Sequence, residues 1–104
     1  MRYFFVVGKI MKEKVPASPN LEIFKQCDFT QFPSPCFIVD KQGVEQNLRI
    51  LAFVKSQSGA KVLSALKAFS MWSLGDLVGR YLDGTCASGL YEAKLGRECY
   101  PGEV

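Results

Sequence analysis

One lysine, Lys67, stands at the end of an apolar run in the middle of the chain. The run, residues 62–66, is short and is followed by a new helical pattern, which is typical of a strand buried on both faces in a parallel sheet. Because side chains alternate along a strand, Leu63, Ala65 and Lys67 are predicted to share one face. In a barrel, Lys67 would then point inward at the carboxyl end of its strand.

A lysine at that position could serve as a covalent nucleophile. Removal of water favours the neutral amine, which condenses with an aldehyde to form a Schiff base. The small side chain of Ala65 would leave room beneath Lys67 for a flat ring. The alternative is that Lys67 has no chemical role and only marks the point where the chain reaches the solvent, with the methylene groups of its side chain covering apolar surface.

Two strand-helix steps are predicted to position Lys67. A short strand at residues 36–39 follows Pro33 and Pro35, which favour extended backbone. Asp40 suits a helix N-cap, apolar residues recur at helical spacing over residues 44–55, and Ser58-Gly59 ends that helix.

The second step follows the Lys67 strand. Its helix is predicted from five apolar residues at helical spacing: Leu74, Leu77, Val78, Tyr81 and Leu82. Ser73 and Asp76 are spaced as a capping box at its start. Asp83-Gly84 ends the helix, residues 85–88 form a short strand, and residues 90–97 resume a helical pattern. Strand, helix, strand and helix with short links are typical of parallel β/α repeats.

Composition and charge exclude several classes of function. Hydrophobic residues make up 48% of the 104 residues and charged residues 22%, as in ordinary globular domains. The net charge of +3 is spread along the chain, so no basic patch for nucleic acid is predicted. Histidine is absent, which excludes serine-histidine catalysis and histidine-bound zinc in this segment. No metal site is predicted.

The cysteines and the amino-terminal residues indicate a reduced compartment. The four cysteines, Cys27, Cys36, Cys86 and Cys99, contain no Cys-x-x-Cys pair and are predicted to be reduced thiols. Lysines at positions 9, 12 and 14 interrupt the apolar residues 3–7 well short of a membrane span. A cytoplasmic protein without membrane contact is therefore predicted.

Longer strings carry a resemblance to a known family. They are residues 33–40 (PSPCFIVD), 47–51 (NLRIL), 65–73 (ALKAFSMWS) and 81–97 (YLDGTCASGLYEAKLGR). With them the chain resembles the amino-terminal part of the carboxynorspermidine decarboxylases, which are pyridoxal-phosphate enzymes. This family is part of the alanine-racemase-like barrel group, together with the ornithine and diaminopimelate decarboxylases. The wider group has Ala-x-Lys-Ala-Asn; here Phe69 replaces the asparagine, and Met71-Trp72-Ser73 follow as in the carboxynorspermidine branch.

The resemblance implies an α/β fold, namely the amino-terminal fragment of a pyridoxal-phosphate-binding (β/α)8 barrel. Such a barrel needs about 250 residues, so it is incomplete in this chain. Residues 1–32 are then an extension of unknown role, and residues 33–104 are the first β/α units of a truncated barrel. The family's phosphate-binding loop, its acidic partner for the pyridine nitrogen and its second β domain would lie outside this sequence.

The resemblance also implies a site. Lys67 corresponds to the Schiff-base lysine, and Thr85 or Ser88 would face the pyridoxal 5'-phosphate. Ser88 is one residue further from Glu92 than in the Ser-x-x-Glu of the wider group, and the alternative is that Ser88 caps the next helix. Met71 and Trp72 could border the substrate pocket, although an aromatic residue at a helix start more often serves packing.

The implied activity is decarboxylation of carboxynorspermidine or carboxyspermidine to norspermidine or spermidine, in polyamine biosynthesis by a homodimer. The fragment alone is predicted to be inactive. Two alternatives remain open at this point. One is a non-catalytic pyridoxal-phosphate-binding barrel, and the other is an inactive fragment or relative that serves only as an interaction surface.

Overall fold

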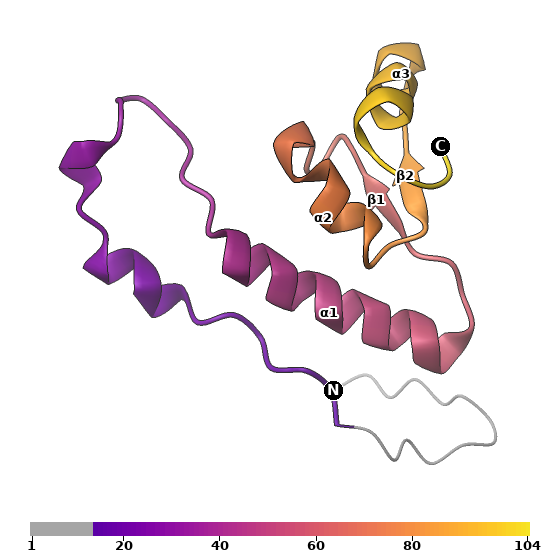
Figure 1. The fold of residues 1–104 in the computed structure, drawn as a ribbon, viewed down its shortest axis with the longest axis horizontal. Coiled ribbons are helices and arrows are strands. Elements are labelled where there is room, and N and C mark those ends of the chain that lie inside the picture. Colours follow the sequence, from indigo (N-terminus) through magenta and orange to yellow (C-terminus); the bar gives the residue numbers. More distant parts are fainter. Residues whose placement is uncertain (1–13) are drawn as a thin grey trace.

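The computed structural model describes residues 14–104 of the chain. Residues 14–40 form an extended arm with two short 3-10 turns, η1 (Leu21–Gln26) and η2 (Phe29–Gln31), that leads back into the amino end of α1 (Figure 1). The predictions for residues 3–7 and for the lysines at positions 9 and 12 lie outside the described residues. None of the helices within residues 14–104 combines the length and apolarity needed to cross a bilayer.

The strand predicted at residues 36–39 is not formed. These residues have no strand partner among the described residues, and the side chain of Phe37 is 101% exposed. An isolated extended segment has no ladder of hydrogen bonds to hold it as a strand. The prediction of a first strand before α1 is therefore wrong for this structure.

The long helix α1 (Lys41–Ser58) begins and ends where the sequence predicts. Asp40 is its N-cap, and the Asp40 carboxylate accepts a hydrogen bond from the backbone N–H of Gln42 at 3.1 Å. At the other end Gly59 adopts the left-handed conformation with φ of 69°, and its N–H donates to the carbonyl of Lys55. Glycine adopts this conformation without a Cβ clash.

Two strands form a parallel sheet. β1 (Leu63–Ala65) pairs with β2 (Gly84–Cys86), with Ser64 opposite Thr85 and Ala65 opposite Cys86. On the other side of β2 the backbone at Glu103 makes a parallel bridge to Gly84, and the N–H of Thr85 donates to the Glu103 carbonyl at 2.8 Å. The three parallel segments thus lie in the order of the sequence, as predicted for consecutive β/α repeats.

The helix predicted around residues 74–82 is shorter than expected. It consists of η3 (Trp72–Leu74) and α2 (Gly75–Gly79), after which residues 80–83 turn toward β2. The predicted capping box is wrong, because Ser73 lies inside η3 and no side chain caps either segment. The predicted apolar face is confirmed, since Leu74, Leu77, Val78 and Leu82 are all buried.

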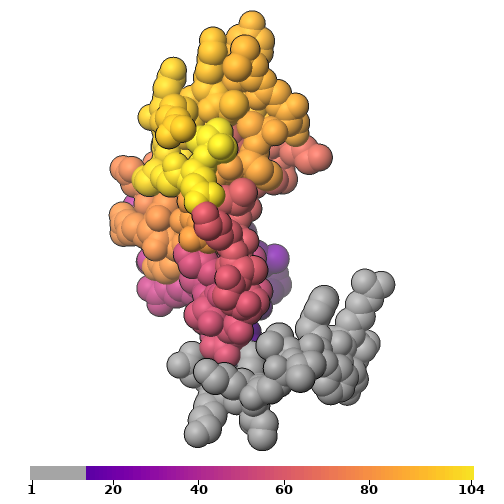
Figure 2. Space-filling view, turned by 90° about the vertical axis from the view of Figure 1, so that its right-hand side faces the viewer, coloured from indigo at the N-terminus to yellow at the C-terminus, as the bar shows by residue number. Residues whose placement is uncertain are grey.

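The helix α3 (Leu90–Cys99) covers β2 and completes the small core. Close contacts require glycine here: a Cβ on Gly96 would lie 2.6 Å from the hydroxyl of Thr85. The buried hydrophobic residues are Leu48, Leu66, Leu74, Leu77, Val78, Leu82 and Tyr100. Figure 2 shows α3 and the carboxyl-terminal residues gathered at one end of the body and α1 at the other. This small mixed α/β unit is compatible with part of an α/β barrel.

Candidate active site

The candidate site is the carboxyl edge of the sheet. Lys67 is the second residue after β1, and Ser88 is the second residue after β2. Because the strands are parallel and their last residues, Ala65 and Cys86, are paired, the chain brings Lys67 and Ser88 out at the same edge. Active sites of parallel α/β sheets are built at this edge.

Lys67 lies in a turn rather than on the strand. The carbonyl of Ala65 accepts hydrogen bonds from the N–H groups of both Ala68 and Phe69, at 3.0 and 3.2 Å, which bends the chain away from the sheet. The predicted strand over residues 62–66 is therefore too long, since β1 covers only Leu63–Ala65, and an inward Lys67 in a complete barrel stays a prediction. The side chain of Lys67 is exposed and has no ion pair or hydrogen bond within residues 14–104. Its role as cofactor lysine stays a prediction.

Thr85 does not share the open edge with Lys67. Its side chain is 1% exposed and points toward Gly96 of α3. Its hydroxyl is buried and has no hydrogen-bond partner within the described residues. Contact between Thr85 and a cofactor stays a prediction, and this position beneath α3 does not favour it.

Ser88 is exposed, but its side chain does not cap α3. The N-cap is Gly89, without a side-chain cap, so the alternative reading of Ser88 as the cap is wrong. Instead the carboxylate of Glu92 accepts a hydrogen bond from the backbone N–H of Ser88 at 2.7 Å. Glu92 therefore contacts the backbone of the residue before the N-cap. The hydroxyl of Ser88 has no partner within residues 14–104 and is available to a ligand.

An apolar hollow of about 440 Å³ adjoins this edge. It lies between α1 and β1, and its lining includes Leu48, Leu51, Ala65, Ala68 and Phe69. Its size is in the range of small-molecule pockets. The sequence analysis missed this hollow, because its walls come from segments up to about 38 residues apart that only the tertiary structure brings together. The one signal was Ala65, whose small size was expected to leave space.

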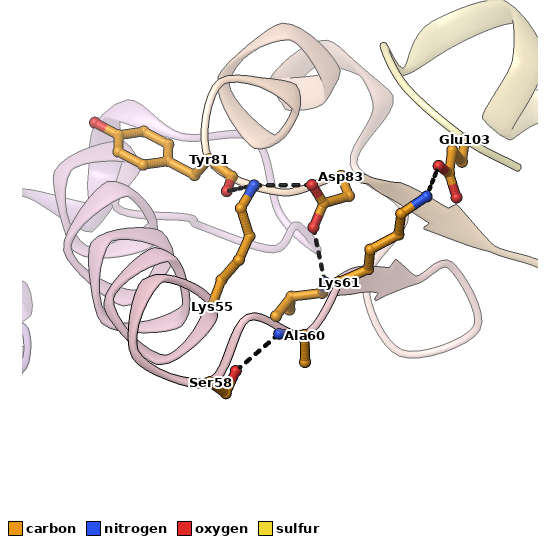
Figure 3. Close-up of polar contacts among 8 residues, drawn as sticks. Lys55, Ser58, Ala60, Lys61, Tyr81, Asp83 and Glu103 are labelled. Carbon is orange, nitrogen blue, oxygen red and sulfur yellow. Dashed lines mark hydrogen bonds and ion pairs between the residues drawn. The ribbon is translucent and has the colours of Figure 1, made fainter. Parts of the chain in front are cut away.

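The opposite edge of the sheet is held by Asp83 (Figure 3). One carboxylate oxygen of Asp83 accepts from Lys55 Nζ at 2.9 Å, and the other accepts from the N–H of Val62 at 2.8 Å. The hydrogen bond from Lys55 lowers the pKa of the Asp83 carboxyl below its ordinary value. Lys61 forms an ion pair with Glu103 at the same end of the sheet. These contacts set the register of the strands and so position Lys67 and Ser88 at the far edge.

The donor set at the carboxyl edge consists of an amine and a hydroxyl. Within residues 14–104 no group of three or more histidine, cysteine, aspartate or glutamate side chains is arranged to hold a metal ion. The amine of Lys67 is accessible and unengaged in the described residues, which fits covalent attachment of an aldehyde. A parallel β/α unit with a lysine at this edge is compatible with a segment of an α/β-barrel enzyme.

Comparisons with known proteins confirm the resemblance found in the sequence. No protein-family model matches the chain. It is 47% identical over 71 residues to a carboxynorspermidine/carboxyspermidine decarboxylase of Herminiimonas arsenicoxydans, covering 68% of this chain and 20% of that protein. It is 38% identical over 76 residues to the enzyme of the same name from Campylobacter jejuni, covering 73% of this chain and 20% of the relative.

A third relative has a related name. The chain is 31% identical over 84 residues to a carboxyaminopropylagmatine decarboxylase of Synechocystis, covering 81% of this chain and 22% of that protein. The chain therefore spans about a fifth of the length of the relatives it matches. Because the chain has 104 residues, every continuous stretch of 71 residues contains residues 34–71. The region matched by the Herminiimonas arsenicoxydans protein therefore includes Lys67.

Proposed function

We propose that this chain is the amino-terminal part of a pyridoxal-phosphate-dependent decarboxylase of polyamine biosynthesis. The substrate would be carboxynorspermidine or carboxyspermidine, and the product norspermidine or spermidine. The observation that carries the proposal is the 47% identity to a decarboxylase of this name over a region that includes Lys67. A cytoplasmic homodimer, with residues 33–104 as the first β/α units of each barrel, is part of the same proposal.

Lys67 would hold the cofactor through its amine, and Ser88 would offer a hydroxyl at the same edge. When bound, pyridoxal phosphate supplies an electron sink for the charge left on carbon as carbon dioxide departs. The described residues leave Lys67 exposed. The exclusion of water that favours condensation with an aldehyde would come from the remainder of the proposed barrel.

The test uses the whole natural protein that contains this sequence. The protein is saturated with pyridoxal phosphate, reduced with borohydride, digested and analysed by mass spectrometry. We expect the reduced pyridoxyl group on Lys67. An adduct on Lys61 or Lys94 instead would contradict the assignment, because Lys61 pairs with Glu103 at the opposite edge and Lys94 lies on α3.

Activity is measured in parallel as release of carbon dioxide from carboxynorspermidine. Lys67→Ala should lose the adduct, and its turnover should fall by orders of magnitude, since a methyl group cannot condense with an aldehyde. Lys67→Arg should also fail, because a guanidinium stays protonated. Lys61→Ala is the matched control and should keep the adduct. An adduct on Lys67 without decarboxylation would favour a non-catalytic cofactor-binding barrel, and no adduct at all would favour an interaction fragment.

A further inference from the structure

Trp72 lies exposed at the end of the connection that carries Lys67. It is the first residue of η3, and its side chain is 63% exposed. Phe69, in the same connection, packs against the hydrophobic core instead. The connection is therefore anchored by Phe69, and packing against the described residues does not explain the indole of Trp72. An exposed tryptophan at a candidate active-site edge is a candidate ligand contact.

Trp72 follows Lys67 by five residues, on the connection that leaves the carboxyl edge of the sheet. Five residues of extended chain span at most about 18 Å, and the turn after Ala65 shortens this path. A carboxylate follows four residues after Trp72: Asp76, in the first turn of α2, is exposed and has no ion pair within residues 14–104. An exposed aromatic face and an exposed carboxylate each favour a cation over an anion as a ligand.

The substrate class of the proposed function has the matching charge. A carboxylated polyamine presents an amino-acid end, which reacts, and a tail of amines that are protonated at neutral pH, as alkyl amines are. With the reacting end at Lys67, the cationic tail would begin at the carboxyl edge. In the resemblance described above, Met71-Trp72-Ser73 follows the carboxynorspermidine branch rather than the wider barrel group.

We propose, on the basis of the proposed function, that Trp72 binds the cationic tail of the polyamine substrate through its indole face, with Asp76 as a second contact. Trp72 is then a specificity-determining residue rather than a catalytic one. Its contribution is a cation–π interaction, which strengthens when the barrel excludes water from the edge. Molecules with the same amino-acid end but no second amine would gain nothing from it.

The kinetic test uses the holoenzyme and compares wild type, Trp72→Ala and Trp72→Phe with carboxynorspermidine as substrate. Trp72→Ala should raise KM roughly 3- to 30-fold, the range expected for loss of a cation–π contact, with a smaller change in kcat. Trp72→Phe retains an aromatic face and should recover most of the loss. Phe29→Ala removes an aromatic residue of similar exposure, 54%, from the distant arm and should match wild type. An unchanged KM in Trp72→Ala overturns the proposal.

A binding test separates this proposal from the proposed function. Norspermidine, which lacks the carboxylate, is titrated into the holo-protein by calorimetry. Trp72→Ala should weaken its binding by a factor similar to the change in KM, and Asp76→Asn should weaken it less. If the wild-type protein decarboxylates carboxynorspermidine but binds norspermidine no more tightly than Trp72→Ala does, the role of Trp72 is refuted and the proposed activity is not. If the wild-type protein binds norspermidine through Trp72 but does not decarboxylate carboxynorspermidine, the proposed activity is refuted and the polyamine contact is supported.

Discussion

Lys55 and Asp83 join the last turn of α1 to the start of β2. Their Nζ and Oδ1 atoms are 2.9 Å apart, and the second oxygen of Asp83 accepts from the N–H of Val62, just before β1 (Figure 3). The N–H of Asp83 in turn donates to the Val62 carbonyl at 3.0 Å. One carboxylate therefore connects a helix end and the amino ends of both strands. The side chains of Lys55 and Asp83 are 35% and 24% exposed, so the pair is only partly screened by water.

Removal of the charge on Asp83 should destabilise the fold. In Asp83→Asn the ion pair is lost, and the amide has one acceptor oxygen for the two donors that the carboxylate serves. We expect a Tm several degrees below wild type in a thermal melt followed by circular dichroism. Glu98→Gln, an exposed position on α3 with no ion pair within residues 14–104, is the control and should not shift the Tm. Equal melting of the two variants would contradict the linking role of Asp83.

Acid should weaken the fold through the same carboxyl group. The hydrogen bond from Lys55 lowers the pKa of Asp83 below its ordinary value of 3.8. The unfolded chain therefore binds more protons, and the stabilisation is fully present above about pH 4 and is lost as the pH falls through the folded pKa. Urea unfolding between about pH 6 and pH 3 should show a decline in wild type that is shallower in Asp83→Asn. Parallel declines would argue that other groups cause the acid sensitivity.

A methyl group at Gly84 should displace the third parallel segment. A Cβ there would lie 2.2 Å from the carbonyl oxygen and 2.5 Å from the nitrogen of Glu103, which are backbone atoms that cannot rotate away. Gly84→Ala should cost about 1–3 kcal/mol or more of unfolding free energy and expose the amide of Thr85 to hydrogen exchange. In Gly89→Ala the new Cβ would meet no atom within 4 Å, so this control should fold as wild type does. A protected Thr85 amide in Gly84→Ala would refute the clash.

Truncation of the Leu66 side chain should destabilise the fold. Its side chain is 2% exposed and contacts the region of Gly96, between β1 and α3. Leu66→Ala should lower the unfolding free energy by about 2–5 kcal/mol. Leu90→Ala removes the same atoms at a position that is 68% exposed and should change it by no more than about 0.5 kcal/mol. Urea denaturation of both variants makes the comparison, and similar midpoints would show that Leu66 is not part of the core.

The sequence by itself determined the features that depend on near neighbours. Both ends of α1 follow from bonds that span two to four residues, namely from Asp40 to Gln42 and from Gly59 to Lys55. The apolar spacing of Leu74, Leu77 and Val78 likewise predicts the face that is buried. The family resemblance could also be recognised from the sequence, because it depends on strings of residues and not on their contacts. Such local preferences are encoded residue by residue.

Tertiary structure decided where the strands end and which side chains reach the site. β1 stops at Ala65 because its carbonyl bonds to the turn that follows, which leaves Lys67 exposed. Thr85 is buried because α3 brings Gly96 over it, and the segment at residues 36–39 is not a strand because no described strand pairs with it. The bond between Lys55 and Asp83 joins residues 28 apart in sequence. Pairing and burial depend on partners distant along the chain, and a pattern of neighbouring residues does not contain them.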